Sequence, residues 1–193
     1  ADHQSFCSLM RPFASFADQC LSLGSGLMSL TETYRSVVLD HNRAPRRFGR
    51  LAAASVCATG VNALCGDRLT IDLLLSDERL LDFAFDAEAS ALTLAATSIM
   101  GDLICGLSLA DAGKLAEAAL DLLTRNPDGV ENPRLGEFNA FLSVLGYPNR
   151  IKTVTLPWAT LIGALSGRLA TSTDVNIRGA QQPDRINSRS STA

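Results

Sequence analysis

The apolar residues between positions 69 and 85 follow a period of two. The first alternating stretch is followed by the polar run at residues 76–79 and then by a second alternating stretch. A period of two puts successive side chains on opposite faces of a strand, so the pattern predicts two half-buried strands joined as a hairpin. The alternating apolar residues are Leu69, Ile71, Leu73 and Leu75 in the first stretch and Leu81, Phe83 and Phe85 in the second.

Elsewhere the apolar residues follow a helical period. A helix is predicted from the capping sequence at residues 29–32 to about His41, and residues 52–59 are a candidate third strand. After Glu88 the helical period continues to the end of the patterned region, with breaks at Gly106 and at residues 126–129. Strands that precede a run of helices predict an α+β fold, an antiparallel sheet with helices packed on one face.

The two ends of the chain lack a periodic apolar pattern. Residues 1–27 have neither the basic start nor the continuous apolar run of a secretory signal, and we expect them to be a disordered or non-native extension. Residues 28–168 form the predicted domain. Residues 169–193 are rich in polar side chains and are predicted to be a disordered tail.

Composition narrows the possible partners. Hydrophobic residues make up 47% of the 193 residues and charged residues 19%, which is typical of a globular protein. The net charge of −3 gives no electrostatic reason to bind nucleic acid, and no apolar run is long enough to cross a membrane. Five irregularly spaced cysteines fit neither a disulfide framework nor a zinc ribbon and favour a reducing, cytoplasmic setting.

The candidate chemistry lies at residues 62–68, which read NALCGDR. Gly66 has no Cβ, so the backbone can turn tightly enough to bring Cys65 and Asp67 toward one point. A thiolate beside a carboxylate suits zinc or iron better than magnesium or calcium. Two ligands are not a complete site, however, because zinc normally takes three or four protein ligands.

Three segments in the same order resemble the U-type iron–sulfur cluster scaffold family, which includes IscU, SufU and the amino-terminal domain of NifU. Residues 34–49, YRSVVLDHNRAPRRFG, resemble the opening helix and loop of that family. Residues 62–68 resemble its Cys-Gly-Asp turn, and residues 150–158, RIKTVTLPW, resemble its closing helix. The resemblance covers most of the chain and implies a three-stranded antiparallel sheet with helices on one face.

The resemblance also implies a site of three cysteines and one aspartate that holds an iron–sulfur cluster or zinc. Cys65 and Asp67 match the first cysteine and the aspartate, whereas the other two cysteines fall on Ser90 and Thr153. Hydroxyl side chains stay protonated near neutral pH and are weak ligands for zinc or iron. We therefore expect Cys65 and Asp67 to be the remaining metal or cofactor ligands, and tight binding to be lost.

Three hypotheses about function follow. By resemblance the protein takes part in iron–sulfur cluster assembly as a scaffold or sulfur acceptor, not as a conventional enzyme, with Cys65 accepting persulfide from a cysteine desulfurase. Its other partners would be iron–sulfur assembly proteins. Alternatively, it is a non-catalytic interaction or regulatory protein that keeps the scaffold fold and its partner surface. In the third hypothesis Cys65 is structural and Asp67 caps a turn.

Overall fold

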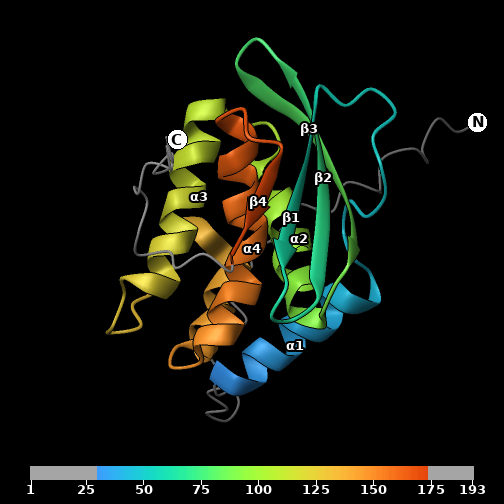
Figure 1. The fold of residues 1–193 in the computed structure, drawn as a ribbon. Helices are drawn as coiled ribbons and strands as arrows, with labels where there is room; N and C mark the ends of the chain where they lie inside the picture. The colour runs from blue at the N-terminus through green and yellow to red at the C-terminus, as the bar shows by residue number, and fades with distance from the viewer. Residues whose placement is uncertain (1–29, 174–193) are drawn as a thin grey trace, which may run out of the picture.

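A computed structural model describes residues 30–173 and shows an α+β fold (Figure 1). The first helix is followed by three strands, and the remaining helices precede a short last strand. The elements are α1 (Leu30–Arg43), β1 (Val56–Asn62), β2 (Asp67–Ser76), β3 (Arg79–Glu88), α2 (Ala91–Ile104), α3 (Leu109–Thr124), the 3-10 segment η1 (Pro133–Val144), α4 (Pro148–Leu165) and β4 (Ala170–Ser172).

The predicted hairpin is confirmed as β2 and β3, which pair antiparallel. Its loop is formed by Asp77 and Glu78, whose φ angles of 49° and 60° are both left-handed, as a two-residue hairpin loop with the right twist requires. The candidate third strand is β1, which begins later than predicted, at Val56, and pairs antiparallel with β2.

The prediction of a three-stranded antiparallel sheet is wrong in one respect. The sheet has four strands in the order β3-β2-β1-β4, and β4 runs parallel to β1, so the sheet is mixed. The three residues of β4 are too few to show a period of two in the sequence. They become a strand because the chain turns back after α4 and lies along the free edge of β1 (Figure 1).

The same strand corrects the predicted start of the disordered tail. The Thr59 N–H donates to the Leu169 carbonyl at 2.9 Å, and the Thr173 N–H donates to the Val61 carbonyl at 3.2 Å. Residues 169–173 therefore belong to the domain. The rest of the predicted tail and the predicted extension at residues 1–27 lie outside the described residues.

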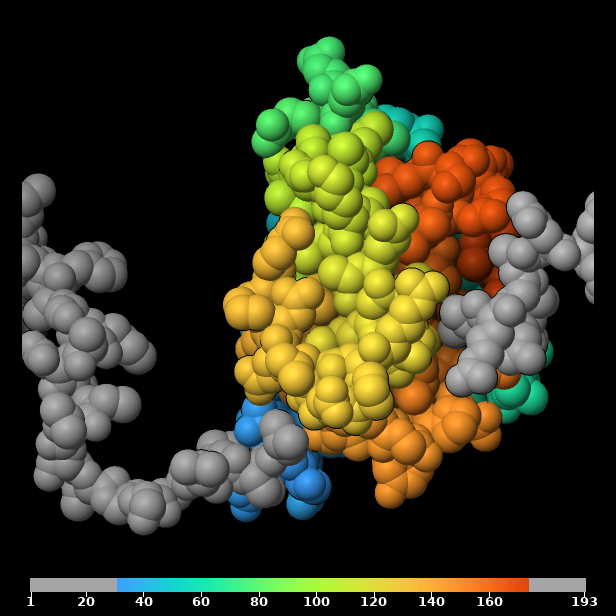
Figure 2. Space-filling view, turned by 90° about the vertical axis from the view of Figure 1, so that its left-hand side faces the viewer, coloured from blue at the N-terminus to red at the C-terminus, as the bar shows by residue number. Residues whose placement is uncertain are grey.

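Helices cover one face of the sheet. α2 and α4 lie against the strands, and α3 packs on α4 from the outer side (Figure 1). Figure 2 looks onto this helical side, with α3 across its middle. Most strand side chains that alternation assigns to the core are buried on the inner face, including Leu69, Ile71 and Leu73. The assignment of Leu81 is wrong: it is 51% exposed and Leu80 is buried instead, because the register of β2 and β3 shifts between Leu74 and Leu75. Trp158 of α4 is also fully buried and packs edge-on against Phe138, with ring centroids 5.2 Å apart.

The sheet and α4 approach each other most closely at Gly60. A Cβ on this residue of β1 would overlap the hydroxyl oxygen of Thr160 in α4. Thr153 precedes Thr160 by about two helical turns, so it lies on the same face of α4. The close contact at Gly60 thus fixes the side of α4 that faces the end of β1. None of the helices within residues 30–173 is long and apolar enough to span a membrane.

Replacing Gly60 by alanine should destabilise the domain, because the added methyl has no room beside Thr160. The expected loss is about 2 kcal/mol in the free energy of unfolding, as for other overpacked cores. Gly113 is the matched control, since it lies inside α3 with open space around its Cα. Gly113→Ala should raise stability by about 0.5–1 kcal/mol, because alanine is the better helix former. Denaturant titration measures both, and equal stabilities would contradict the close approach.

Candidate functional site

The turn between β1 and β2 presents Cys65 and Asp67 on either side of a left-handed glycine. Gly66 has a φ of 72°, a conformation that costs other residues energy and glycine nothing. Nothing lies within 4 Å of the position its Cβ would take, so backbone conformation and not space requires glycine here. Cys65 is exposed at the tip, whereas Asp67 is only 1% exposed. The thiol therefore faces solvent and the carboxylate faces the protein.

The Asp67 carboxylate binds the beginning of α2. Its Oδ1 accepts the backbone N–H of Ser90 at 2.7 Å, and its Oδ2 accepts the Thr93 hydroxyl at 2.8 Å. The Ser90 hydroxyl lies 3.3 Å from the same Oδ2. Ser90 makes no side-chain cap of its own for α2. Asp67 thus caps α2 from another element, and its negative charge lies at the positive end of the helix dipole.

Thr153 of α4 lies beside the thiol. Its Oγ1 is 3.2 Å from Cys65 Sγ, 3.0 Å from the Asn149 carbonyl and 3.4 Å from Asn62 Nδ2. A carbonyl can only accept, so the single hydroxyl proton of Thr153 goes to Asn149. The Thr153 oxygen is then left to accept from the Asn62 amide and from the Cys65 S–H. This arrangement satisfies Cys65 as a protonated thiol.

Contacts therefore connect all four positions that the sequence resemblance selects. Asp67 binds Ser90, Cys65 contacts Thr153, and Thr93 lies between the two pairs, with its hydroxyl oxygen 2.8 Å from Asp67 Oδ2 and 3.3 Å from the Thr153 carbonyl. The sequence analysis did not single out Thr93. The sequence feature that could have identified Thr93 is its position three residues after Ser90. A side chain at that helical position turns back toward the residue before the helix.

The sequence analysis gave Asn62 no role of its own either. Its side chain is fully buried, and its amide contacts Thr153. Asn62 ends β1, so it lies directly before the Cys65 turn. A buried amide at the end of a strand is hard to distinguish from an ordinary turn residue by sequence alone.

These residues do not fit a tightly bound zinc ion or iron–sulfur cluster. Such groups need three or four thiolate, imidazole or carboxylate ligands, and the four positions supply one thiol and one carboxylate. The Ser90 hydroxyl is directed at Asp67 and the Thr153 hydroxyl at Asn149. Across residues 30–173, no three His, Cys, Asp or Glu side chains gather closely enough to hold a metal ion.

The other two cysteines of the described region lie elsewhere. Cys57 pairs with Asp72 across β1 and β2, beside Arg50. Burial, together with a hydrogen bond to Asp72, raises the pKa of the Cys57 thiol. Burial likewise raises the pKa of Cys105, which follows the end of α2. Neither contacts the four positions.

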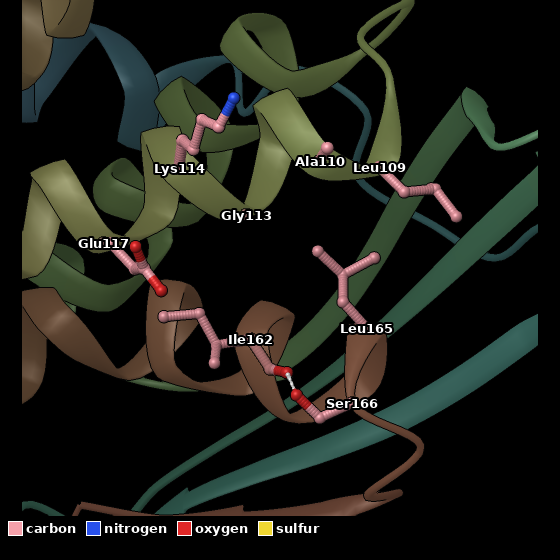
Figure 3. A pocket seen from close by; sticks show the side chains of 8 residues that line it. All are labelled: Leu109, Ala110, Gly113, Lys114, Glu117, Ile162, Leu165 and Ser166. Atoms are coloured by element: carbon pink, nitrogen blue, oxygen red, sulfur yellow. Dashed lines mark hydrogen bonds between the residues drawn. The ribbon is translucent and has the colours of Figure 1, made fainter.

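A groove of about 210 Å³ between α3 and α4 is separate from this site (Figure 3). It is lined by Leu109, Ala110, Gly113, Lys114, Glu117, Ile162, Leu165 and Ser166. Its α4 residues come from the carboxyl-terminal end of the helix, whereas Thr153 is in the amino-terminal half. The groove contains no thiol, and its two charged side chains come from one helix. It adds nothing to the chemistry at Cys65.

Residues 33–154 match the family model described as the NifU-like N terminal domain. This match covers well over half of the chain. The chain belongs to the NifU-like N-terminal domain family. The resemblance drawn from the three sequence motifs is thereby confirmed.

Curated relatives of this NifU-like domain are named for iron–sulfur cluster assembly or for sulfur transfer. It is 31% identical over 157 residues to the iron–sulfur cluster assembly scaffold protein IscU of Streptococcus pyogenes serotype M1, covering 79% of this chain and 96% of that protein. It is 29% identical to the zinc-dependent sulfurtransferase SufU of Bacillus subtilis, covering 69% of this chain and 89% of SufU. These relatives include both a scaffold and a sulfurtransferase.

Solved structures share the fold. A SUF-system scaffold candidate from Fervidobacterium islandicum AW-1 superimposes with a TM-score of 0.64 at 27% identity, covering 69% of this chain and 96% of that one. The amino-terminal part of a NifU-like protein from Brucella abortus gives a TM-score of 0.62 at 26% identity, covering 72% and 96%. The NifU-like domain thus spans nearly the whole length of both.

The three described cysteines should differ in reactivity toward iodoacetamide. Alkylation uses the thiolate, and a raised pKa leaves less thiolate at a given pH, so Cys57 and Cys105 should react more slowly at pH 7.5 than cysteine in an unstructured peptide. Their rates should keep rising as the pH is increased beyond the usual cysteine pKa. Cys65 should be labelled first. Peptide mapping by mass spectrometry measures each site, and labelling of Cys57 ahead of Cys65 would contradict the expectation.

Proposed function

We propose that this NifU-like domain is an iron–sulfur cluster assembly protein of the scaffold or sulfur-acceptor type, in which Cys65 receives sulfur. The observation that carries the proposal is the exposed Cys65 thiol at the point where the turn, α2 and α4 meet. The names of its relatives support the proposal, since one is an iron–sulfur cluster assembly scaffold protein and another a zinc-dependent sulfurtransferase.

The sulfur-transfer step needs only one thiol on this chain. The Cys65 sulfur, after losing its proton to solvent, attacks the outer sulfur of a persulfide on a cysteine desulfurase. A new S–S bond forms at Cys65, the S–S bond of the donor breaks, and the donor cysteine leaves as a thiolate that takes up a proton. No net oxidation occurs. Deprotonation of Cys65 frees the Thr153 oxygen of one donor and leaves its bonds to Asn149 and Asn62 intact.

The same proposal holds that this chain does not bind zinc or a cluster tightly by itself. Ser90 and Thr153 take the places of two thiolates, and their protons are committed to Asp67 and Asn149. A cluster in transit would need thiolates from another protein. The partners we propose are accordingly a cysteine desulfurase and other iron–sulfur assembly proteins, in the cytoplasm, where five cysteines would stay reduced.

One observation favours a second function, that of a non-catalytic interaction protein. The Thr153 oxygen accepts a hydrogen bond from the Cys65 S–H, so this thiol already serves a contact within the domain. Asp67 is likewise occupied with capping α2. A domain that keeps the scaffold shape while both remaining ligands serve internal contacts could bind the same partners without accepting sulfur.

Persulfide labelling distinguishes these two functions. Incubation with a cysteine desulfurase and cysteine should add one sulfur atom to Cys65, seen by peptide mass spectrometry. Cys65→Ser should abolish the label while Cys57→Ser, the matched control, should leave it unchanged. Desulfurase binding without label on Cys65 would favour the interaction protein. Absence of both binding and label would overturn both functions.

Rebuilding the ligand set tests the proposed loss of metal binding. The unmodified protein should purify with far less than one zinc per chain, because two thiolates are missing. Ser90→Cys combined with Thr153→Cys should bring the content to about one zinc per chain, since three thiolates and a carboxylate form a tetrahedral set. Each single variant should gain less. Elemental analysis measures the content, and a folded double variant without zinc would mean that the four side chains do not converge on one metal.

A further inference from the structure

Two sets of hydrogen bonds connect the elements that a metal at these positions would connect: Asp67 with Ser90 and Thr93, and Asn62 with Thr153. A metal ion bound by side chains from separate elements cross-links them, and its binding energy becomes folding energy. Here Asp67 begins β2, Ser90 and Thr93 begin α2, and Thr153 lies in α4. We infer that this hydroxyl–carboxylate network replaces a metal as the cross-link, so that the domain reaches full stability with no cation bound.

This inference does not rest on the proposed function. It concerns how the fold is held together, and it stands whether or not Cys65 accepts sulfur. It also goes beyond weak metal binding, because a chain that had only lost its ligands would be left with an unsatisfied buried carboxylate and loosely joined elements. The network predicts the opposite, a site that is closed and stable by itself.

Three hydrogen-bond donors meet the Asp67 carboxylate. The Ser90 N–H is directed at Oδ1, while the hydroxyls of Thr93 and Ser90 are both directed at Oδ2. The two lone pairs of Oδ2 are thereby used. A carboxylate that is 1% exposed would be costly to bury without such donors, and hydrogen bonds to a charged acceptor are the stronger kind.

Thr93 is the central residue of the network. Its hydroxyl lies 2.8 Å from Asp67 Oδ2 and 3.3 Å from the Thr153 carbonyl, so its single proton goes to the nearer, charged oxygen. It is fully buried, and water cannot take its place. A second link runs from the end of β1 to α4 through the Asn62 amide and Thr153 Oγ1.

The matched test compares Thr93→Val with Thr97→Val. Both residues are fully buried on α2, one turn apart, and valine removes only the hydroxyl. Thr97 donates to the Thr93 carbonyl within its own helix, outside the network. Thr93→Val should lower Tm by about 5 °C or more, because it removes a bond to a buried charge. Thr97→Val should lower Tm by no more than about 2 °C, since it loses only a local bond within the helix.

Asp67→Asn completes a double-mutant cycle. With the charge removed, Thr93→Val should cost little more than Thr97→Val does, so the effects at positions 67 and 93 should not add. Thr93→Ser keeps a hydroxyl and should hold Tm near the wild-type value, which preserves the test if the valine variant fails to fold. Additive effects, or equal losses for the two valine variants, would overturn the network as a cross-link.

The last measurement uses the unmodified protein with zinc chloride or EDTA. Tm should be the same in both to within about 1 °C, because no cation contributes to the folded state. The Ser90→Cys, Thr153→Cys variant should instead lose Tm when EDTA is added. An increase of several degrees with zinc in the unmodified protein would overturn the inference. The persulfide assay on Cys65 is unaffected by either result, so the inference and the proposed function fail separately.

Discussion

The Asp67 carboxylate lies at the first residue of β2 and accepts both the backbone and side-chain donors that begin α2. This interaction joins the start of the second strand to the start of the helical layer. Because the carboxylate is buried, its charge has to be met by protein donors, and Ser90 and Thr93 meet it. α4 packs beside α2 and is joined to the end of β1 by the contact between Asn62 and Thr153.

The chemistry at Cys65 depends on the same arrangement. Sequence comparison with the scaffold family suggests a defective metal site, since two of three cysteines are absent. The contacts instead show that both hydroxyls donate hydrogen bonds. The Ser90 hydroxyl donates to Asp67, and the Thr153 hydroxyl donates to the Asn149 carbonyl. Of the four positions, only Cys65 carries a thiol, and it is exposed on a turn.

The place of Thr153 in the site depends on how α4 packs against β1 about two helical turns away. Gly60 lets the helix approach β1 more closely than any side chain would allow, and Thr153 follows from the helical period. β4 then closes the edge of β1 that would otherwise be free. The residue after it, Thr173, donates its N–H to the Val61 carbonyl in the strand that leads into the Cys65 turn. An exposed strand edge so close to a reactive thiol would invite pairing with other chains.

The sequence alone determined the local structure: the alternation at residues 69–85 predicted the hairpin, and Cys65-Gly66-Asp67 predicted a tight turn. Three motifs in order identified the family. What the sequence could not decide were contacts between distant segments, because neither a three-residue strand nor a threonine in an apolar helix carries a local signal. The parallel pairing of β4, the role of Thr93 and the direction of the Thr153 proton depend on which groups folding brings within hydrogen-bond distance. Only the tertiary structure fixes those distances, and they decide what Cys65 and Asp67 can do.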